Sequence, residues 1–229
     1  HIEAPWIPPE LINHGKPIVS LGRLCKWLAE HAEEKGVTIM PGFAGVDMLW
    51  DGDAVNGVRT GDRGIGKDGQ PTDEFEPGMD LTSPVTILGE GPRGHLSRKV
   101  IQRRDLDANS QPMIYEIGVK EILELPEGSV KDGFVAHTLG YPLDMETFGG
   151  SFLYTMGSNK VCIGLLVAAD AKNPNLDVHL ELQRLKTHPY IKSIIGEGKV
   201  VRYGAKAVTI GGWASMPQLY TDGCMVVGD

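Results

Sequence analysis

The first periodic run of apolar residues predicts an amphipathic helix over Leu21–Lys35. Apolar side chains recur there every three or four positions, at Leu24, Trp27 and Leu28, and this spacing gathers them on one face of a helix. Gly36 follows, as is typical of a helix end. The first seventeen residues are rich in proline, so an extended, irregular lead-in is expected before the helix.

Short apolar runs in the rest of the first half predict strands. The run Asp51-Gly-Asp53 separates two of them and favours a hairpin. Residues 61–78 are rich in Gly, Asp, Lys and Pro without periodicity, which is typical of a loop or a wide hairpin. The last run is expected to be a buried strand that leads through glycines into a helix over 94–104. The strands are predicted over 37–40, 43–50, 54–60 and 81–88.

After Asn109 the pattern changes to closely spaced strand-like segments, which predicts an antiparallel sheet. These segments cover 113–119, 134–139, 150–156 and 160–167. A helix over 176–187 should end before Pro189, because the residue before a proline disfavours the helical conformation. Later strands are predicted over 199–209 and 224–227, and they return the chain to the layer formed by its first half. The fold class is therefore α+β or α/β, with a partial cofactor-binding layer and an inserted antiparallel β-sheet domain.

Composition narrows the possible functions. A chain of 229 residues with 41% hydrophobic content can bury a core without help from disulfides or metals. The formal net charge of −8 argues against a nucleic-acid partner, which requires a basic surface. The basic cluster of Arg98, Lys99, Arg103 and Arg104 is interpreted as a solvated helix face. No apolar stretch approaches the roughly twenty residues of a membrane-spanning helix, and the start has no signal-peptide pattern.

Motifs for metal binding or acid–base catalysis are not found in the sequence. The three cysteines Cys25, Cys162 and Cys224 are far apart and form no Cys-x-x-Cys pair, so buried free thiols are favoured over a metal site. No Gly-x-Ser-x-Gly motif occurs, and the histidines have unrelated contexts. We therefore assign no catalytic residue and no metal ligand within this chain.

Glycines next to apolar strands are the main candidates for ligand contacts. The segment Pro84–Leu96 runs from a strand through Gly89-Glu90-Gly91 towards a helix, an arrangement that brings backbone close to a phosphate or a cofactor. A second strand, Cys224–Asp229, ends on Gly228-Asp229. Phe148-Gly-Gly-Ser-Phe152 places two glycines within a strand, which indicates either a β-bulge or a close approach to a ligand. Gly211-Gly212-Trp213 has the same ambiguity.

Several segments together resemble the electron transfer flavoprotein-ubiquinone oxidoreductases. They follow one another in the order of that family over essentially the whole chain, although they cover only the middle of the family's length. The segments are residues 61–69, 86–96, 115–121, 137–143, 147–154, 186–189 and 203–207.

The resemblance implies a membrane-surface enzyme that takes electrons from reduced electron transfer flavoprotein. The electrons pass through FAD and a [4Fe-4S] cluster to ubiquinone. The resemblance also implies that Gly149 and Gly150 contact the quinone headgroup. It places Gly89, Glu90 and Gly91, together with Gly228 and Asp229, along the FAD, with Asp229 near the ribitol chain.

The same resemblance implies a domain organisation. Residues 1–108 would form a partial, glutathione-reductase-like FAD-binding domain that lacks the family's N-terminal Gly-x-Gly-x-x-Gly unit. Residues 109–208 would form the antiparallel ubiquinone-binding domain, and residues 209–229 would return to the FAD-binding domain. The cysteines that bind the cluster are expected outside this chain.

The implied location is peripheral or monotopic, at a bacterial inner membrane or the mitochondrial inner membrane. The lead-in that contains Trp6 would either rest on the bilayer surface or pack against the protein. Two other functions stay open. One is an FAD-dependent reductase or hydroxylase that acts on a lipid or isoprenoid, and the other is a quinone- or lipid-binding module without redox activity.

Overall fold

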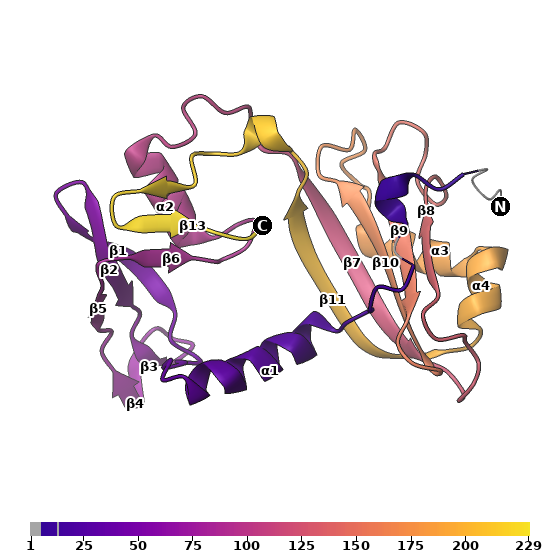
Figure 1. Ribbon diagram of the computed structural model, residues 1–229, viewed down its shortest axis with the longest axis horizontal. Coiled ribbons are helices and arrows are strands. Elements are labelled where there is room, and N and C mark those ends of the chain that lie inside the picture. The colour runs from indigo at the N-terminus through magenta and orange to yellow at the C-terminus, as the bar shows by residue number, and fades with distance from the viewer. Residues whose placement is uncertain (1–5, 13) are drawn as a thin grey trace. The chain divides into compact units, whose positions relative to one another are not determined.

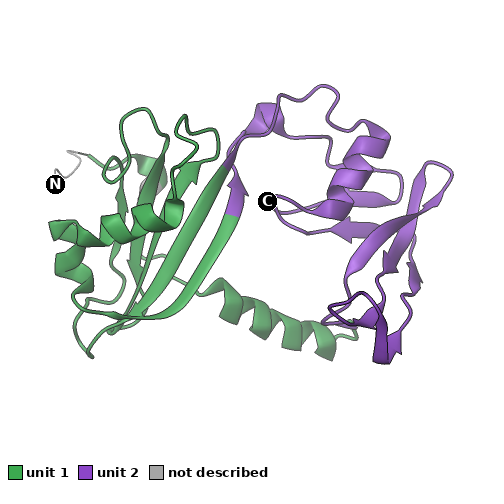
Figure 2. Cartoon of the chain, turned by 180° about the vertical axis from the view of Figure 1, so that it is seen from behind, with its two compact units in different colours: residues 1–37, 116–206 green, residues 38–115, 207–229 purple. Residues whose placement is uncertain are grey.

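The computed structural model describes residues 6–12 and 14–229 (Figure 1). It divides into two compact units, one of residues 1–37 and 116–206 and the other of residues 38–115 and 207–229 (Figure 2). The mixed α/β architecture with antiparallel sheets agrees with the predicted fold class. The predicted domain of residues 1–108 spans parts of both units, since residues 1–37 group with the sheet of the first unit.

The first unit is built on a five-stranded sheet with the order β11-β7-β10-β9-β8. Its strands pair antiparallel from β7 through β10 and β9 to β8, as the alternating segments predict. The strands are β7 (Tyr115–Glu124), β8 (Val135–Thr138), β9 (Gly149–Thr155), β10 (Lys160–Ala168) and β11 (Lys199–Thr209).

Alternate residues of this sheet form the core of the first unit with two helices. Val161, Ile163 and Leu165 of β10 are fully buried, together with Leu182 and Leu185. The helices are α3 (Val178–Thr187) and α4 (Pro189–Ile195). A buried leucine or isoleucine stabilises such a core by roughly 1.5–3 kcal/mol, so this layer holds the sheet in place.

Helix α4 was not predicted from the sequence. Helix α3 ends before His188-Pro189 as predicted, but Pro189 then occupies the first position of a new helix. Proline suits that position because the N–H it lacks would have no helical partner there. The His188 side chain accepts a hydrogen bond from the Tyr190 N–H, at 3.2 Å, and caps α4.

Helix α1 (Leu21–Glu34) confirms the predicted amphipathic helix, although none of its residues is buried. A short 3₁₀-helix, η1 (Pro9–Leu11), lies within the predicted irregular lead-in. Residues 1–5 of that lead-in and residue 13 lie outside the described part. The predicted strand over 37–40 is wrong. These residues have no regular secondary structure and belong to none of the sheets in the described part of the chain.

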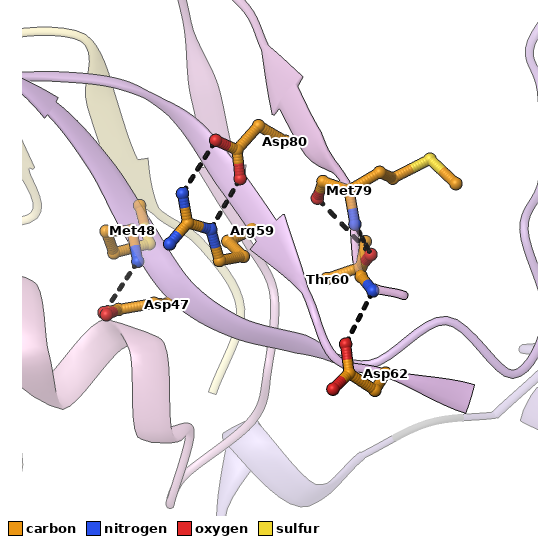
Figure 3. Close-up of polar contacts among 8 residues, drawn as sticks. Asp47, Met48, Arg59, Thr60, Asp62, Met79 and Asp80 are labelled. Atoms are coloured by element: carbon orange, nitrogen blue, oxygen red, sulfur yellow. Dashed lines mark hydrogen bonds and ion pairs between the residues drawn. The ribbon is translucent and has the colours of Figure 1, made fainter. Parts of the chain in front are cut away.

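In the second unit the predicted hairpin is present, as β1 (Gly45–Asp51) and β2 (Ala54–Thr60). Strand β5 (Asp80–Thr82) pairs with β2, where the Arg59 guanidinium donates two hydrogen bonds to the Asp80 carboxylate at 2.6 and 2.8 Å (Figure 3). For residues 61–78 the sequence predicted a loop or a wide hairpin. The structure shows the hairpin, with strands β3 (Arg63–Ile65) and β4 (Pro71–Glu76).

The predicted single strand over 81–88 is divided into two strands that belong to different sheets. Strand β5 ends at Thr82, and β6 (Thr86–Leu88) begins a separate sheet. The break lies at Ser83-Pro84, where the Ser83 hydroxyl donates to the Val85 carbonyl at 2.9 Å and proline can donate no ladder hydrogen bond. Strands β12 (Tyr220–Thr221) and β13 (Cys224–Val226), helix α2 (His95–Arg104) and the 3₁₀-helix η2 (Trp213–Ser215) complete the unit.

Candidate functional site

Two parallel strands bring the predicted cofactor turns together at one edge of the second unit. Strands β6 and β13 pair in parallel with Leu88 opposite Val226, and the Val227 N–H donates to the Leu88 carbonyl at 2.9 Å. The turns that begin at Gly89 and Gly228 therefore leave the sheet at the same carboxyl edge. In open α/β sheets, ligands bind outside this edge.

A cavity of about 590 Å³ opens beside this edge and lies entirely within the second unit. Its lining comes from four segments, 91–107, 113–115, 209–219 and 226–229, and includes the apolar side chains Met113, Met216, Leu219 and Val226. The volume lies within the range of ligand pockets for small molecules and cofactors. Of the predicted FAD contacts, the cavity brings together Gly91, Gly228 and Asp229, whereas Gly89 and Glu90 are not among its lining residues.

The glycine turn between β6 and α2 has the spacing Gly89-x-Gly91-x-x-Gly94, directly after a strand and before a helix. This spacing is that of dinucleotide-binding turns, and sequence reasoning did not use it. Gly91 has φ of 78°, which only glycine adopts freely. A Cβ atom on Gly94 would lie 2.4 Å from the Glu90 Cβ. The turn therefore leaves no room for a side chain at position 94.

Glu90 points to the start of helix α2. Its carboxylate accepts hydrogen bonds from the Ser97 N–H and the Ser97 hydroxyl, both at 2.7 Å, and from the Leu96 N–H at 3.3 Å. Partial burial acts to raise the pKa of Glu90, but these hydrogen bonds outweigh it and hold the pKa below its usual value. The side chain therefore occupies the helix N-terminus, the position where a Rossmann turn binds a phosphate.

Asp229 lies in the cavity and is anchored to strand β11. Its carboxylate accepts a hydrogen bond from the Thr209 hydroxyl at 2.9 Å. Gly228 has φ of 86° and turns the chain so that Asp229 reaches the cavity. An aspartate held in this way can accept further hydrogen bonds from hydroxyl groups of a ligand.

Arg98 also lines the cavity, whereas the sequence predicted only a solvated helix face for it. Three of the four basic residues on α2 have partners: Lys99 pairs with Asp47 at 3.0 Å, Arg104 pairs with Asp53 at 3.1 Å, and Arg103 covers Trp50 at 3.9 Å. No described residue pairs with the Arg98 guanidinium. Arg98 faces the cavity instead, and helical spacing alone does not show which member of a basic cluster lacks a partner.

In the first unit, Gly149 and Gly150 begin strand β9 and approach the protein's own backbone. A Cβ on Gly149 would lie 2.3 Å from the Leu166 carbonyl oxygen, and a Cβ on Gly150 would lie 2.8 Å from the Thr138 carbonyl oxygen. The strand pairs with β10 through both positions without a register shift. The bulge that the sequence left open is therefore absent from this pairing, and both glycines are required by the sheet itself.

The β8 side of strand β9 is uncovered at Gly149. Pairing with β8 ends at Thr138 opposite Ser151. The Phe148 carbonyl accepts from the Ala168 N–H on the other side, so strand alternation directs the polar backbone groups of Gly149 towards the uncovered side. Two exposed apolar side chains lie next to this end of the strand: Phe148 directly precedes Gly149, and the Leu139 Cδ2 would lie 3.0 Å from a Cβ on Gly150. This end of β9 offers backbone hydrogen-bonding groups within an apolar surface.

Residues 6–12 and 14–229 contain neither a metal-binding cluster nor a membrane-spanning helix. No group of three or more His, Cys, Asp or Glu side chains there could hold a metal ion. Cys162 and Cys224 are buried, which raises the pKa of each thiol, and Cys25 is exposed. Within the same residues, no helix has the length and apolar character required to cross a bilayer.

Comparison with known proteins identifies the family. A family model described as "ETF-QO, ubiquinone-binding" matches residues 115–208. The chain is 44% identical to the mitochondrial electron transfer flavoprotein-ubiquinone oxidoreductase of Homo sapiens over 94% of its length. It belongs to the electron transfer flavoprotein-ubiquinone oxidoreductase family.

Other members of this family match in the same way. The chain is 42% identical to the mitochondrial electron transfer flavoprotein-ubiquinone oxidoreductase of Arabidopsis thaliana. It is 41% identical to the electron transfer flavoprotein-ubiquinone oxidoreductase of the bacterium Pseudomonas aeruginosa, in each case over 97% of its length. It spans 36% of the human and Arabidopsis relatives and 41% of the Pseudomonas relative. The residues described above therefore correspond to somewhat more than a third of these proteins.

Two solved structures show a similar fold. A geranylgeranyl bacteriochlorophyll reductase-like protein from Thermoplasma acidophilum superposes with a TM-score of 0.65 at 16% identity, over 90% of this chain and 46% of that protein. A triple mutant of the flavin-dependent brominase Bmp2 superposes with a TM-score of 0.59 at 13% identity, over 90% of this chain and 48% of the brominase. At these identities the likeness concerns the fold alone.

Proposed function

We propose that this chain supplies the ubiquinone-binding part and a portion of the FAD-binding part of an electron transfer flavoprotein-ubiquinone oxidoreductase. The observation that carries this proposal is the family match over nearly the whole chain, which includes both the cavity of the second unit and the uncovered end of β9. In the whole protein, electrons would pass from reduced electron transfer flavoprotein through FAD to ubiquinone.

The cavity of the second unit suits part of an FAD molecule. Arg98 offers an unpaired cation for a phosphate, Gly91 allows close approach of the ligand to the backbone, and Asp229 can accept hydrogen bonds from ribitol hydroxyls. Glu90 bonds to Ser97 at the start of α2 and is not among the residues that line the cavity, so its proposed role is indirect. When bound, FAD would supply the electron-carrying isoalloxazine ring.

The uncovered end of β9 suits a quinone headgroup. Quinone carbonyl oxygens accept hydrogen bonds, and the Gly149 N–H lies on the side that β8 leaves free. The apolar side chains around it, above all Phe148, provide a surface for the ring and the isoprenoid tail. No proton-transferring side chain is needed for binding at this position.

The remaining parts of the proposed function belong to residues outside this chain. The ligands of a [4Fe-4S] cluster would come from there, because the described cysteines lie singly. The proposed peripheral attachment to a bacterial or mitochondrial inner membrane would likewise involve the whole protein. Contacts with electron transfer flavoprotein are part of the same proposal.

The proposal can be tested without substitutions by labelling the glycines with ¹⁵N. Addition of FAD is expected to shift the amide resonances of Gly91 and Gly228, and addition of a short-tail ubiquinone is expected to shift those of Gly149 and Gly150. Gly69 and Gly128 lie in exposed turns away from both sites and serve as internal controls.

Two outcomes would contradict the proposal. If ubiquinone shifts the control glycines as much as Gly149, its binding is non-specific and the quinone site is refuted. If an isoprenoid alcohol without a quinone ring shifts Gly149 and Gly150 as strongly as ubiquinone does, the reductase of an isoprenoid substrate is the better assignment.

A further inference from the structure

We propose that the indole of Trp213 stacks against the isoalloxazine ring of the flavin at the cavity of the second unit. This inference rests on the proposed function, because it requires FAD in that cavity. It assigns a role to the segment Gly211-Gly212-Trp213, which the sequence left ambiguous between a β-bulge and a close approach to a ligand.

Trp213 lines the cavity and is 87% exposed. Large aromatic side chains stabilise a fold mainly when their surface is buried, and no described ring packs on this indole. Trp50 in the same unit shows the contrast, because its ring is covered by the Arg103 guanidinium at 3.9 Å. An indole that is left free at the wall of a cavity is available for a flat aromatic ligand.

The backbone holds Trp213 in a fixed position. Gly212 has φ of 65° and ψ of −164°, a conformation restricted to glycine. The Ser215 N–H donates to the Gly212 carbonyl at 3.2 Å, and the buried Ser215 hydroxyl donates to the Pro112 carbonyl at 3.1 Å. A Cβ on Gly211 would lie 2.5 Å from Ser215. The exposed indole therefore projects from a constrained turn, which lowers the entropy cost of stacking.

The surroundings favour the isoalloxazine over the adenine of FAD. Met113, Tyr115 and Met216 give the wall beside Trp213 an apolar and aromatic character. Asp229 lines the same cavity and occupies the position proposed for the ribitol contact. The ring attached directly to the ribitol is the isoalloxazine, so this ring should lie nearest to Trp213.

The test uses riboflavin, which carries the isoalloxazine and ribitol without adenine or phosphate. An indole in van der Waals contact quenches isoalloxazine emission, so riboflavin bound to the parent chain should be dark. Trp213→Leu should restore the emission of bound riboflavin severalfold and weaken its affinity about two- to tenfold. Binding itself is followed separately by calorimetry, and Trp27→Leu, which removes another exposed indole, is the matched control.

The outcomes separate this inference from the proposed function. If riboflavin and FAD bind by calorimetry but their emission and affinity are the same in the parent and in Trp213→Leu, the stacking is refuted and the flavin site stands. If AMP competes with riboflavin and loses affinity in the variant, Trp213 contacts the adenine and the inference is overturned. If neither FAD nor riboflavin binds, the flavin site and the stacking fail together.

Discussion

At the residue scale, Glu90 shows how a side chain in a cofactor motif can serve the fold. Its carboxylate satisfies two N–H groups and one hydroxyl at the start of α2, and its side chain is only 21% exposed. Helix N-termini leave their first N–H groups without helical partners, so the contact stabilises α2 directly. Loss of such a cap costs about 1 kcal/mol.

Glu90→Gln is therefore expected to lower the free energy of unfolding by about 1 kcal/mol near neutral pH. The folded pKa of Glu90 lies below its usual value, so this stabilisation is present above the unfolded pKa and disappears as the pH falls through the folded pKa. The difference between parent and variant should shrink accordingly in acid. Urea unfolding at a series of pH values measures it, with exposed Glu74→Gln as the control. A difference that is constant with pH would contradict the ionic cap.

At the element scale, helix α2 presents to the cavity one arginine, Arg98, with which no described residue pairs, and its three other basic side chains have partners elsewhere. Because Arg98 is proposed to contact a phosphate, Arg98→Gln should weaken FAD binding about tenfold and reduce its dependence on salt. Riboflavin, which has no phosphate, should bind both proteins equally. Calorimetric titration measures both ligands, and Lys99→Gln on the same helix is the control. Equal loss of riboflavin affinity would show that Arg98 shapes the cavity and does not contact phosphate.

The elements also show what the sequence could predict. Strands β7 to β11 followed from alternation and turn residues, and α1 followed from apolar spacing, because these signals are local. Helix α4 was missed because Pro189 both ends one helix and begins the next. The break at Ser83-Pro84 was missed because the two short strands belong to different sheets, which is a tertiary fact.

The candidate site likewise contains residues that the sequence predicted and residues that it did not. Gly91, Gly228 and Asp229 were chosen from the sequence and lie together at the cavity, because two parallel strands carry their turns to one edge. Arg98 was interpreted from the sequence as part of a solvated helix face, and Trp213 was named only within an ambiguous glycine segment. Neither pairing nor exposure is visible in a local pattern. The orientation of Glu90 towards α2 likewise depends on distances within the folded turn.

At the scale of the whole molecule, each unit has its own buried core and its own proposed ligand. The core of the first unit joins β7, β9 and β10 to α3 and α4, and that of the second joins β1, β2, β6 and β13 to α2. Proteins open locally in cooperative units of this kind, and each unit has its own free energy of opening. A ligand that binds one unit should therefore slow amide hydrogen exchange in that unit first.

Hydrogen exchange measured by mass spectrometry is expected to show two separate footprints. FAD should protect the segments around Leu88–Gly91 and Val226–Asp229, because it bridges two turns whose strands pair in parallel. A short-tail ubiquinone should protect Phe148–Gly150, which lies beyond the last residue of β9 that pairs with β8. The exposed β3–β4 hairpin should respond to neither ligand. Protection of β9 by FAD alone would contradict independent sites and would show that one ligand orders both units.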